Sequence, residues 1–292
     1  MEWIIRQIRN VAGISQQQLA DYMGVSFATV NRWENGRSYP NQLAQNRLFD
    51  FCKEYHISLN HIIDLKIRNE VEKVSRENKN RIVLYHGSKS GLSGKIAPVS
   101  RTHCDFGKGF YLGTDPLQPL TLICDFEKSK FYVVSLDLKG LKILNIQADI
   151  EWAMLVAYHR GKMEDIQGTA FYEKYQKMAE GFDVIIGYIA NDRMFVVLDN
   201  FFQGTITDTA LVQSLAALKL GQQYVCITQK ACDQLNIEAE IPFSFLERKC
   251  LQEISAQNRA EGISLANDIC RKHRRDGRFF DEILEEAHRG AK

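Results

Sequence analysis

The 292-residue sequence lacks the features that mark disulfide-bonded, secreted or membrane-spanning chains. Its seven cysteines include no C-x-x-C pair and are odd in number, which argues against a disulfide framework or a zinc knuckle. No uninterrupted apolar run approaches the roughly 18 residues of a membrane span. The opening residues, MEWIIRQIRN, lack the long apolar core of a signal peptide. These absences predict a cytoplasmic protein that binds no metal and no membrane.

A strong charge of one sign is also lacking. The formal net charge is +1, so any binding to nucleic acid must come from a local patch rather than from a global field. No G-x-G-x-x-G or Walker loop is present, so a bound nucleotide would have to be held by a different binding motif. Apolar residues make up 45% of the chain, which is enough to give each of two or three domains a core.

Residues 1–68 are expected to form a first domain of short helices. SQQQLADYMG (15–24) has a serine N-cap, an apolar face and a terminal glycine, and SFATVNRWENG (26–36) opens at a second serine cap. This spacing resembles the helix-turn-helix of the phage-repressor (XRE/Cro) family, from Gln7 to Leu65. The resemblance implies a homodimer that binds double-stranded DNA with the second helix in the major groove.

The positions that the resemblance places at bases or phosphates lie on both helices and their caps. They are Ser15, Gln16, Ser26, Phe27, Ala28, Thr29, Asn31, Arg32 and Asn35. Residues 1–68 hold eight Lys and Arg against six Asp and Glu, a small surplus for a DNA-binding domain. The alternative to DNA binding is therefore that the same helical bundle serves only protein–protein contact.

A second domain is expected to begin after a polar linker, residues 69–80, which is either a helix extension or a solvated tether. Short β-type runs then mix with helical segments in no strict alternation, which predicts an α+β domain over residues 81–242. The expected strands lie within 81–87, 109–113, 129–146, 182–189 and 223–229, and the expected helices within 149–159, 171–180 and 209–218.

Two motifs of this domain share residues with a known signature. LYHGS (84–88) and DFGKGFYLGTD (105–115) resemble the NAD-binding signature of the ADP-ribosyltransferases, in the branch of poly(ADP-ribose) polymerases and diphtheria toxin. The wider spacing looks like a bacterial family of unknown function with the same fold. That branch has a His-Tyr-Glu triad, which here reads His86, Tyr111 and Gln223. The resemblance implies a split, mainly antiparallel sheet.

The resemblance also implies that NAD is the co-substrate and gives each motif residue a role. His86 hydrogen-bonds the adenosine ribose, the backbone of Gly87 pairs with the carboxamide, and Tyr111 stacks on the nicotinamide. Further residues implied around the dinucleotide are Ser88, Lys108 near the pyrophosphate, Gly109 and Phe110.

Gln223 departs from the family pattern, in which an acid holds the nicotinamide ribose and supplies negative charge. A neutral amide keeps the hydrogen bonds and loses the charge, so polymer elongation is not expected. Asp192 is the substitute acid that we expect, because it follows an apolar strand at an expected loop; the alternative is an Asx-turn residue. A second ring against the nicotinamide is not evident in PLQPLTLICDF (116–126).

Residues 243–292 are expected to be a helical extension of two or three amphipathic helices, broken near Gly262 and Gly277. The function expected for the whole chain is mono-ADP-ribosyl transfer to a protein or nucleic acid. The enzyme would be a bacterial toxin or defence effector, with an antitoxin as a further partner and a DNA-binding head for autoregulation or targeting. Two alternatives stay open, a non-catalytic NAD-sensing transcriptional regulator and an NAD glycohydrolase.

Overall fold

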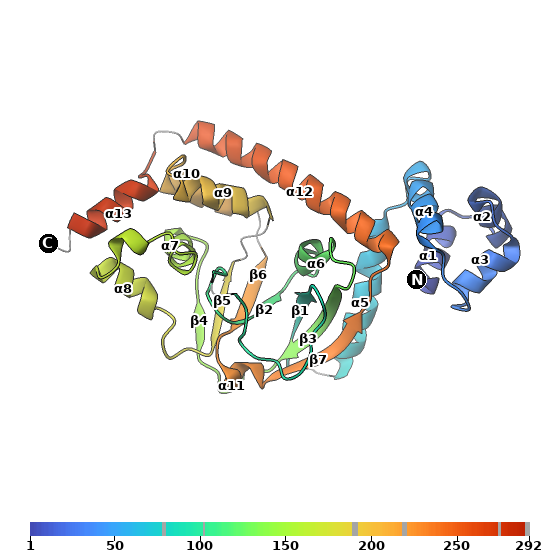
Figure 1. Cartoon of the computed structure of the whole chain (residues 1–292), viewed down its shortest axis with the longest axis horizontal. Helices are drawn as coiled ribbons and strands as arrows, with labels where there is room; N and C mark the ends of the chain where they lie inside the picture. Colours follow the sequence, from blue (N-terminus) through green and yellow to red (C-terminus); the bar gives the residue numbers. More distant parts are fainter. Residues whose placement is uncertain (78–79, 102, 189–191, 218–220, 274–275, 290–292) are drawn as a thin grey trace.

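The computed structural model describes residues 1–77, 80–101, 103–188, 192–217, 221–273 and 276–289, without the side chains of 75–77, 192–195 and 266. Within these ranges a helical head precedes an α+β domain with one mixed sheet, and a long helix starts beside the head and runs along the second domain (Figure 1). The predicted order of an all-α head, an α+β domain and a helical C-terminal segment is confirmed. No helix in the described ranges is long and apolar enough to cross a membrane.

The head has the helix-turn-helix geometry that its capping residues predict. Ser15 and Gln18 form a reciprocal capping box at the start of the first helix of the motif, and Gly24 ends that helix in the left-handed region at φ 67°. Ser26 caps the second helix through the Thr29 backbone N–H. The helices of the head are α1 (Glu2–Val11), α2 (Gln16–Met23), α3 (Phe27–Glu34), α4 (Gln42–Glu54) and α5 (Leu59–Glu77).

A buried carboxylate holds α1, α2 and α3 together. Glu34 is 2% exposed; its Oε1 accepts from Arg9 Nε at 2.6 Å and its Oε2 from Gln16 Nε2 at 2.7 Å. Burial acts to raise the pKa of Glu34, but the hydrogen bonds from Arg9 and Gln16 outweigh it and lower the pKa. Gln16 Oε1 also accepts from Asn31 Nδ2, so these two residues, both predicted to lie at DNA, also brace the head internally.

One seven-stranded sheet forms the centre of the second domain, in the order β4-β5-β6-β2-β1-β3-β7. Among the strands that the structure describes, only β4 and β5 pair in parallel. Strands β1 and β2 are in register at one pair, Tyr85 and Gly113, so the expected split sheet is one sheet whose halves meet at a narrow join. The strands are β1 (Ile82–Ser88), β2 (Phe110–Gly113), β3 (Lys130–Leu136), β4 (Ile143–Asn145), β5 (Val184–Tyr188), β6 (Gln222–Cys226) and β7 (Leu235–Ile241).

Helices cover the two halves of the sheet separately. Trp152 of α7, Phe201 of α9 and Leu211 of α10 belong to one core, which covers the β5–β6 half, whereas α6 packs on β1 and β3. The short helices are α6 (Leu117–Ile123), α7 (Ile150–His159), the 3-10 turn η1 (Glu164–Ile166), α8 (Ala170–Lys177), α9 (Asp192–Phe202), α10 (Asp208–Ala217), α11 (Gln229–Cys232) and α13 (Phe280–Arg289).

The prediction of a loop at Asp192 is wrong, because this residue begins α9. Val197, Leu198, Phe201 and Phe202 are all buried, and their spacing of one, three and four positions is that of one helical face. The apolar stretch after Asp192 therefore docks as a helix.

The predicted break at Gly262 is also wrong. Helix α12 (Phe245–Lys272) runs through this residue without interruption. Gly262 is buried, and α12 packs on α9 and α10, so tertiary contacts outweigh the ~1 kcal/mol that a glycine costs in a helix. The break near Gly277, at φ 86°, is confirmed between α12 and α13.

The head and the sheet share a hydrophobic core. Helix α5 extends through most of the expected linker and packs on β1 and β7, and its Ile67 and Val74 join the same buried cluster as Phe131 of β3 and Leu246 of α12. Polar contacts close the edges of this core. Lys66 Nζ lies 2.7 Å from Glu247 Oε1, and the Leu246 N–H donates to Gln45 Oε1 at 3.1 Å. The start of α12 is thus attached to both α4 and α5.

Candidate functional site

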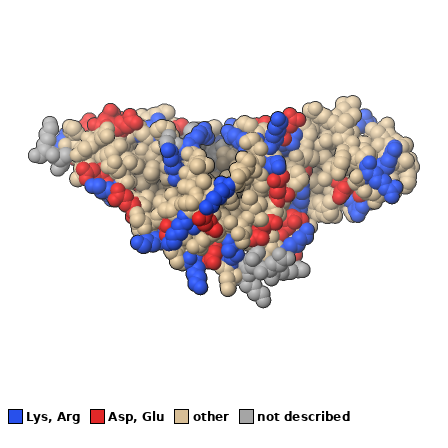
Figure 2. Space-filling model, turned by 60° about the horizontal axis from the view of Figure 1, so that its bottom comes forward, with Lys and Arg blue, Asp and Glu red and all other residues tan. Residues whose placement is uncertain are grey.

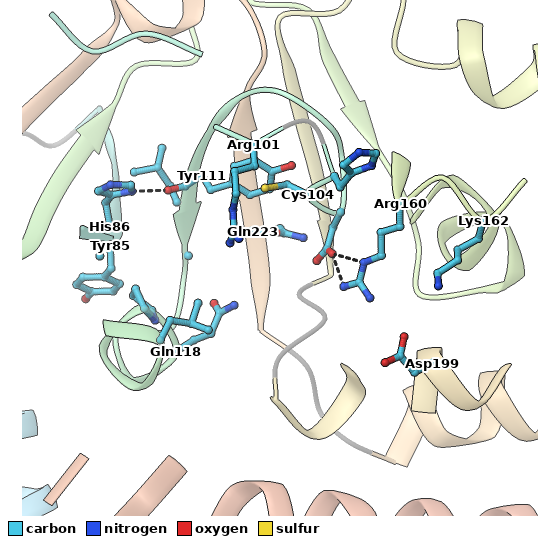
Figure 3. A pocket seen from close by; sticks show the side chains of 17 residues that line it. Tyr85, His86, Arg101, Cys104, Tyr111, Gln118, Arg160, Lys162, Asp199 and Gln223 are labelled. Carbon is cyan, nitrogen blue, oxygen red and sulfur yellow. Dashed lines mark hydrogen bonds and ion pairs between the residues drawn. The ribbon is translucent and has the colours of Figure 1, made fainter. Parts of the chain in front are cut away.

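A pocket of about 840 Å³ lies on the sheet near the narrow join between its halves, with α6 on one side and α9 on the other (Figure 3). A cavity of this size is typical of small-molecule and cofactor sites. It is lined by Tyr85, His86, Gly87, Arg101, His103, Cys104, Asp105, Tyr111, Leu112, Gly113, Gln118, Pro119, Leu122, Arg160, Lys162, Asp199 and Gln223.

His86 enters the pocket from β1 and is fixed by the neighbouring strand. Its Nδ1 lies 2.8 Å from the backbone oxygen of Tyr111, and its ring stacks on Phe110 with centroids 4.3 Å apart. Because a carbonyl only accepts, Nδ1 carries the proton and donates. Burial lowers the pKa of His86, although the hydrogen bond to Tyr111 opposes this shift. The imidazole is therefore neutral at pH 7, which leaves Nε2 as an acceptor.

Tyr111 connects the pocket to the loop that leads into β2. Its hydroxyl donates to the Gly107 carbonyl at 2.8 Å and accepts from the Phe106 N–H at 3.0 Å. Burial raises the pKa of Tyr111 well above its usual value, so the hydroxyl stays protonated. Both hydrogen-bonding roles of the hydroxyl are used within the protein, and Tyr111 offers its ring to the pocket.

Gly87 brings α6 close to β1. A Cβ at this position would lie 2.8 Å from the Pro119 carbonyl oxygen and 3.0 Å from Ile123 Cγ2. Any side chain would therefore push α6 away from the strand. Glycine is therefore needed at position 87 for the close approach of α6, which forms one wall of the pocket.

Gln223 lies on β6, where it faces Gly113 of β2 and Gly187 of β5 across the sheet. Its side chain is buried at 5% exposure, and Nε2 donates to the Tyr188 carbonyl at 3.0 Å. The same carbonyl accepts from Trp152 Nε1 at 3.0 Å. Since the amide nitrogen faces a carbonyl, Oε1 is the end of Gln223 that can accept from a ligand.

The end of the pocket remote from His86 carries charged residues that sequence analysis missed (Figure 3). Arg160 Nη2 lies 2.6 Å from Asp105 Oδ1, and both side chains are about 15% exposed. Lys162 adds a further cation and Asp199 of α9 a second carboxylate at this end, whereas Arg101 lies nearer the middle of the pocket in this view. Arg160 and Lys162 follow α7 and are 49 or more positions from Tyr111, so no local motif connects them with it.

Four of the predicted site residues line this pocket: His86, Gly87, Tyr111 and Gln223. The other predicted dinucleotide residues do not. Phe110 is buried beneath the His86 ring, Lys108 is exposed outside the pocket, the Ser88 hydroxyl donates to the Gly91 carbonyl, and Gly109 packs toward Val225. The side chain of Asp192 lies outside the described residues. Within the described part of the chain, no group of three metal-ligating side chains occurs.

The predicted DNA-contacting residues lie on α2, α3 and the caps of these helices. Thr29, Asn31 and Gln16 are half-buried, and the exposed ones are Ser15, Ser26, Phe27, Ala28, Arg32 and Asn35. Figure 2 shows basic side chains at the head end of the molecule, whereas Lys and Arg are interspersed with Asp and Glu over the rest of that face. Helix α3 itself contributes only Arg32 to the basic charge of the head, which agrees with the small surplus of Lys and Arg in residues 1–68.

Comparison with known families gave two matches. Residues 5–59 match the family described as helix-turn-helix (HTH_3), and residues 82–237 match the family described as protein of unknown function (DUF3990). Neither curated proteins nor solved structures gave a match. Because the second match spans more than half of the 292 residues, this protein belongs to the family described as protein of unknown function (DUF3990), and it carries a helix-turn-helix DNA-binding domain in front of that region.

Proposed function

We propose that the pocket binds NAD and that the protein is a mono-ADP-ribosyltransferase with a DNA-binding head. The observation that carries this proposal is the convergence of His86, Tyr111 and Gln223, from β1, β2 and β6, on one pocket. The LYHGS and FGKGFYLGTD motifs resemble the NAD-binding signature, and their residues meet where a single ligand can contact all three.

The chemistry of the pocket suits the parts of NAD. His86 Nε2 and Gln223 Oε1 are acceptors for ribose hydroxyls, and the Tyr111 ring gives a flat surface for the nicotinamide. The pyrophosphate carries two negative charges, which Arg101, Arg160 and Lys162 can balance. In this proposal these three cations have the role near the pyrophosphate that the resemblance implied for Lys108.

Transfer requires cleavage of the bond between nicotinamide and its ribose. The electron pair of this bond leaves with the nicotinamide, and positive charge develops on the ribose, as in glycoside hydrolysis. The pocket residues clamp both ends of the dinucleotide and so hold the bond in a reactive conformation. An acceptor nucleophile then attacks the ribose carbon and completes the transfer.

The test measures NAD binding and nicotinamide release with the full chain. NAD is expected to raise the melting temperature and to release nicotinamide in the presence of cell lysate as the source of acceptor. Arg101→Ala should weaken the NAD-induced stabilisation, and Lys108→Ala, a cation outside the pocket, should not. If NAD neither stabilises the protein nor releases nicotinamide, the proposal is wrong.

A second candidate, an NAD-sensing transcriptional regulator, is favoured by the packing of α12. This helix contacts α6, which lines the pocket, and α4 of the head, and Gln252 of α12 donates to Asp125 just after α6 at 2.9 Å. A ligand that shifts α6 would therefore also shift α12, and through α12 the position of α4 in the DNA-binding head. Stabilisation by NAD without nicotinamide release, together with an NAD-dependent change in DNA affinity, is the result that this candidate requires.

A further inference from the structure

The neutral side chain at position 223 raises the question of which group supplies negative charge. Gln223 is not simply a glutamate without its charge, because its Nε2 donates to the Tyr188 carbonyl at 3.0 Å. A carboxylate in the same place would set an oxygen against that carbonyl oxygen in a buried site. This position of the sheet is built for an amide, and the charge must come from elsewhere.

Two carboxylates line the pocket among the residues that the structure describes, Asp105 and Asp199. Asp105 is already committed, since its Oδ1 accepts from both Nη2 and Nε of Arg160, at 2.6 Å and 3.2 Å. The carboxylate of Asp199 makes no hydrogen bond or ion pair with any described residue, and Figure 3 shows it directed into the cavity. Asp199 therefore has its charge available for a ligand.

Helix α9 fixes the place of this carboxylate. Val197, Leu198 and Phe201 anchor the helix in the core, each at 0% exposure. Asp199 lies between these anchors in sequence and is half-buried on the flank of the helix that borders the pocket. The backbone that carries it is held by packing, so the carboxylate reaches the pocket from a rigid element.

We propose that Asp199 is the catalytic carboxylate of this pocket, which rests on the function proposed above. When the bond between nicotinamide and ribose breaks, its electron pair neutralises the pyridinium nitrogen and neutral nicotinamide leaves. The Asp199 carboxylate stabilises the cationic ribose that remains. As the acceptor hydroxyl or amine bonds to the ribose carbon, its proton moves to Asp199.

The experiment compares Asp199→Asn and Asp199→Glu in the full chain. Asp199→Asn keeps the shape and removes the charge, so nicotinamide release should fall by about 100-fold or more, while stabilisation by NAD persists. Asp199→Glu keeps the charge on a longer side chain and should restore release to within about tenfold of the wild type. Asp165→Asn, an exposed aspartate on η1, is the matched control and should change neither readout.

The outcomes separate this inference from the proposed function. If the wild type neither binds NAD nor releases nicotinamide, the proposed function fails, and the inference with it. Nicotinamide release at the wild-type rate by Asp199→Asn overturns the inference alone. If Asp199→Asn is too unstable to assay, Asp199→Glu is compared with Asp199→Ser, which removes the charge. Equal losses of nicotinamide release in these two variants would show that the charge at position 199 has no role, and would overturn the inference.

Discussion

The imidazole of His86 is hydrogen-bonded to the backbone of Tyr111, the residue that forms the next wall of the pocket, with 2.8 Å between Nδ1 and the carbonyl oxygen. A residue on one strand thus fixes the orientation of the ring on the adjacent strand. The arrangement presents one ring nitrogen, Nε2, as an acceptor of constant charge at and above neutral pH, because burial lowers the pKa of His86.

His86→Ala is expected to weaken NAD binding about tenfold, the usual loss for one hydrogen bond of about 1.4 kcal/mol. The affinity of the wild type should not change between pH 8 and pH 7, because His86 is neutral throughout. Calorimetric titration with NAD measures both effects. His288→Ala, which removes an exposed histidine of α13, should bind as the wild type does; a tenfold change in wild-type affinity across that pH range would contradict the assignment.

Gln223→Glu is expected to destabilise the protein by about 1–3 kcal/mol, because a buried carboxylate meets the Tyr188 carbonyl without a donor. Nicotinamide release should fall rather than rise. Urea unfolding gives the stability, and a nicotinamide assay gives the rate. Gln222→Glu makes the same change at the exposed neighbouring position and should have little effect. Faster nicotinamide release by Gln223→Glu would contradict this prediction and show that position 223 can still serve as the site of a catalytic acid.

The sequence was sufficient for the features that local rules govern. Serine caps and Gly24 predicted the helix-turn-helix, and apolar runs predicted β1, β2, β5 and β6. Strand β7 was missed because it is an edge strand with a largely polar sequence, NIEAE, that only its pairing with β3 makes extended. The extended conformation of β7 depends on the strand it pairs with, so its own residues do not predict it.

The predicted site was incomplete for the same reason. His86 and Tyr111 belong to motifs, whereas Arg160, Lys162 and Asp199 reach the pocket because α7 and α9 pack on the other half of the sheet. Asp192 was chosen from its position after a strand, a local criterion. Nothing in a short window of sequence connects Asp199 with Gln223, because tertiary packing alone brings them to one cavity.

His159 is expected to make the protein sensitive to acid. Burial lowers its pKa to about 4 from an ordinary 6.5, against the opposing charge of Asp105, and its Nε2 is buried without a partner among the described residues. The unfolded chain therefore binds a proton more readily than the folded chain, and stability falls as pH drops from 6.5 toward 4. This one residue should cost about 2 kcal/mol at pH 5 relative to pH 7.5.

Urea unfolding of the wild type and of His159→Phe at both pH values measures this contribution. Phenylalanine keeps a ring against Gly107 and cannot titrate, so the difference between the two pH values should shrink by about 2 kcal/mol. An equal pH dependence in the two proteins would show that His159 is protonated in the folded state as easily as in the unfolded one.

Arg32→Ala is expected to weaken binding to a random-sequence DNA duplex and to lower the salt slope of binding by about one. Arg32 is exposed on α3, and its Nε donates to the Ala28 carbonyl of the same helix at 3.2 Å, so the change should leave the fold intact. Fluorescence anisotropy at several salt concentrations measures the slope. Lys128→Ala, an exposed cation of the second domain, is the control, and an equal effect of both variants would argue against α3 as the contact surface.

Helix α12 determines where the chain can be divided. Because Leu246 and Leu251 complete the core beneath α4 and α5, a fragment that ended before residue 245 would leave the apolar surface of the head open to water. The head is therefore not a transplantable module, although its own sequence is contiguous. A chimera that exchanges heads between relatives would have to carry α5 and α12 together, and the intact chain should melt in a single cooperative transition.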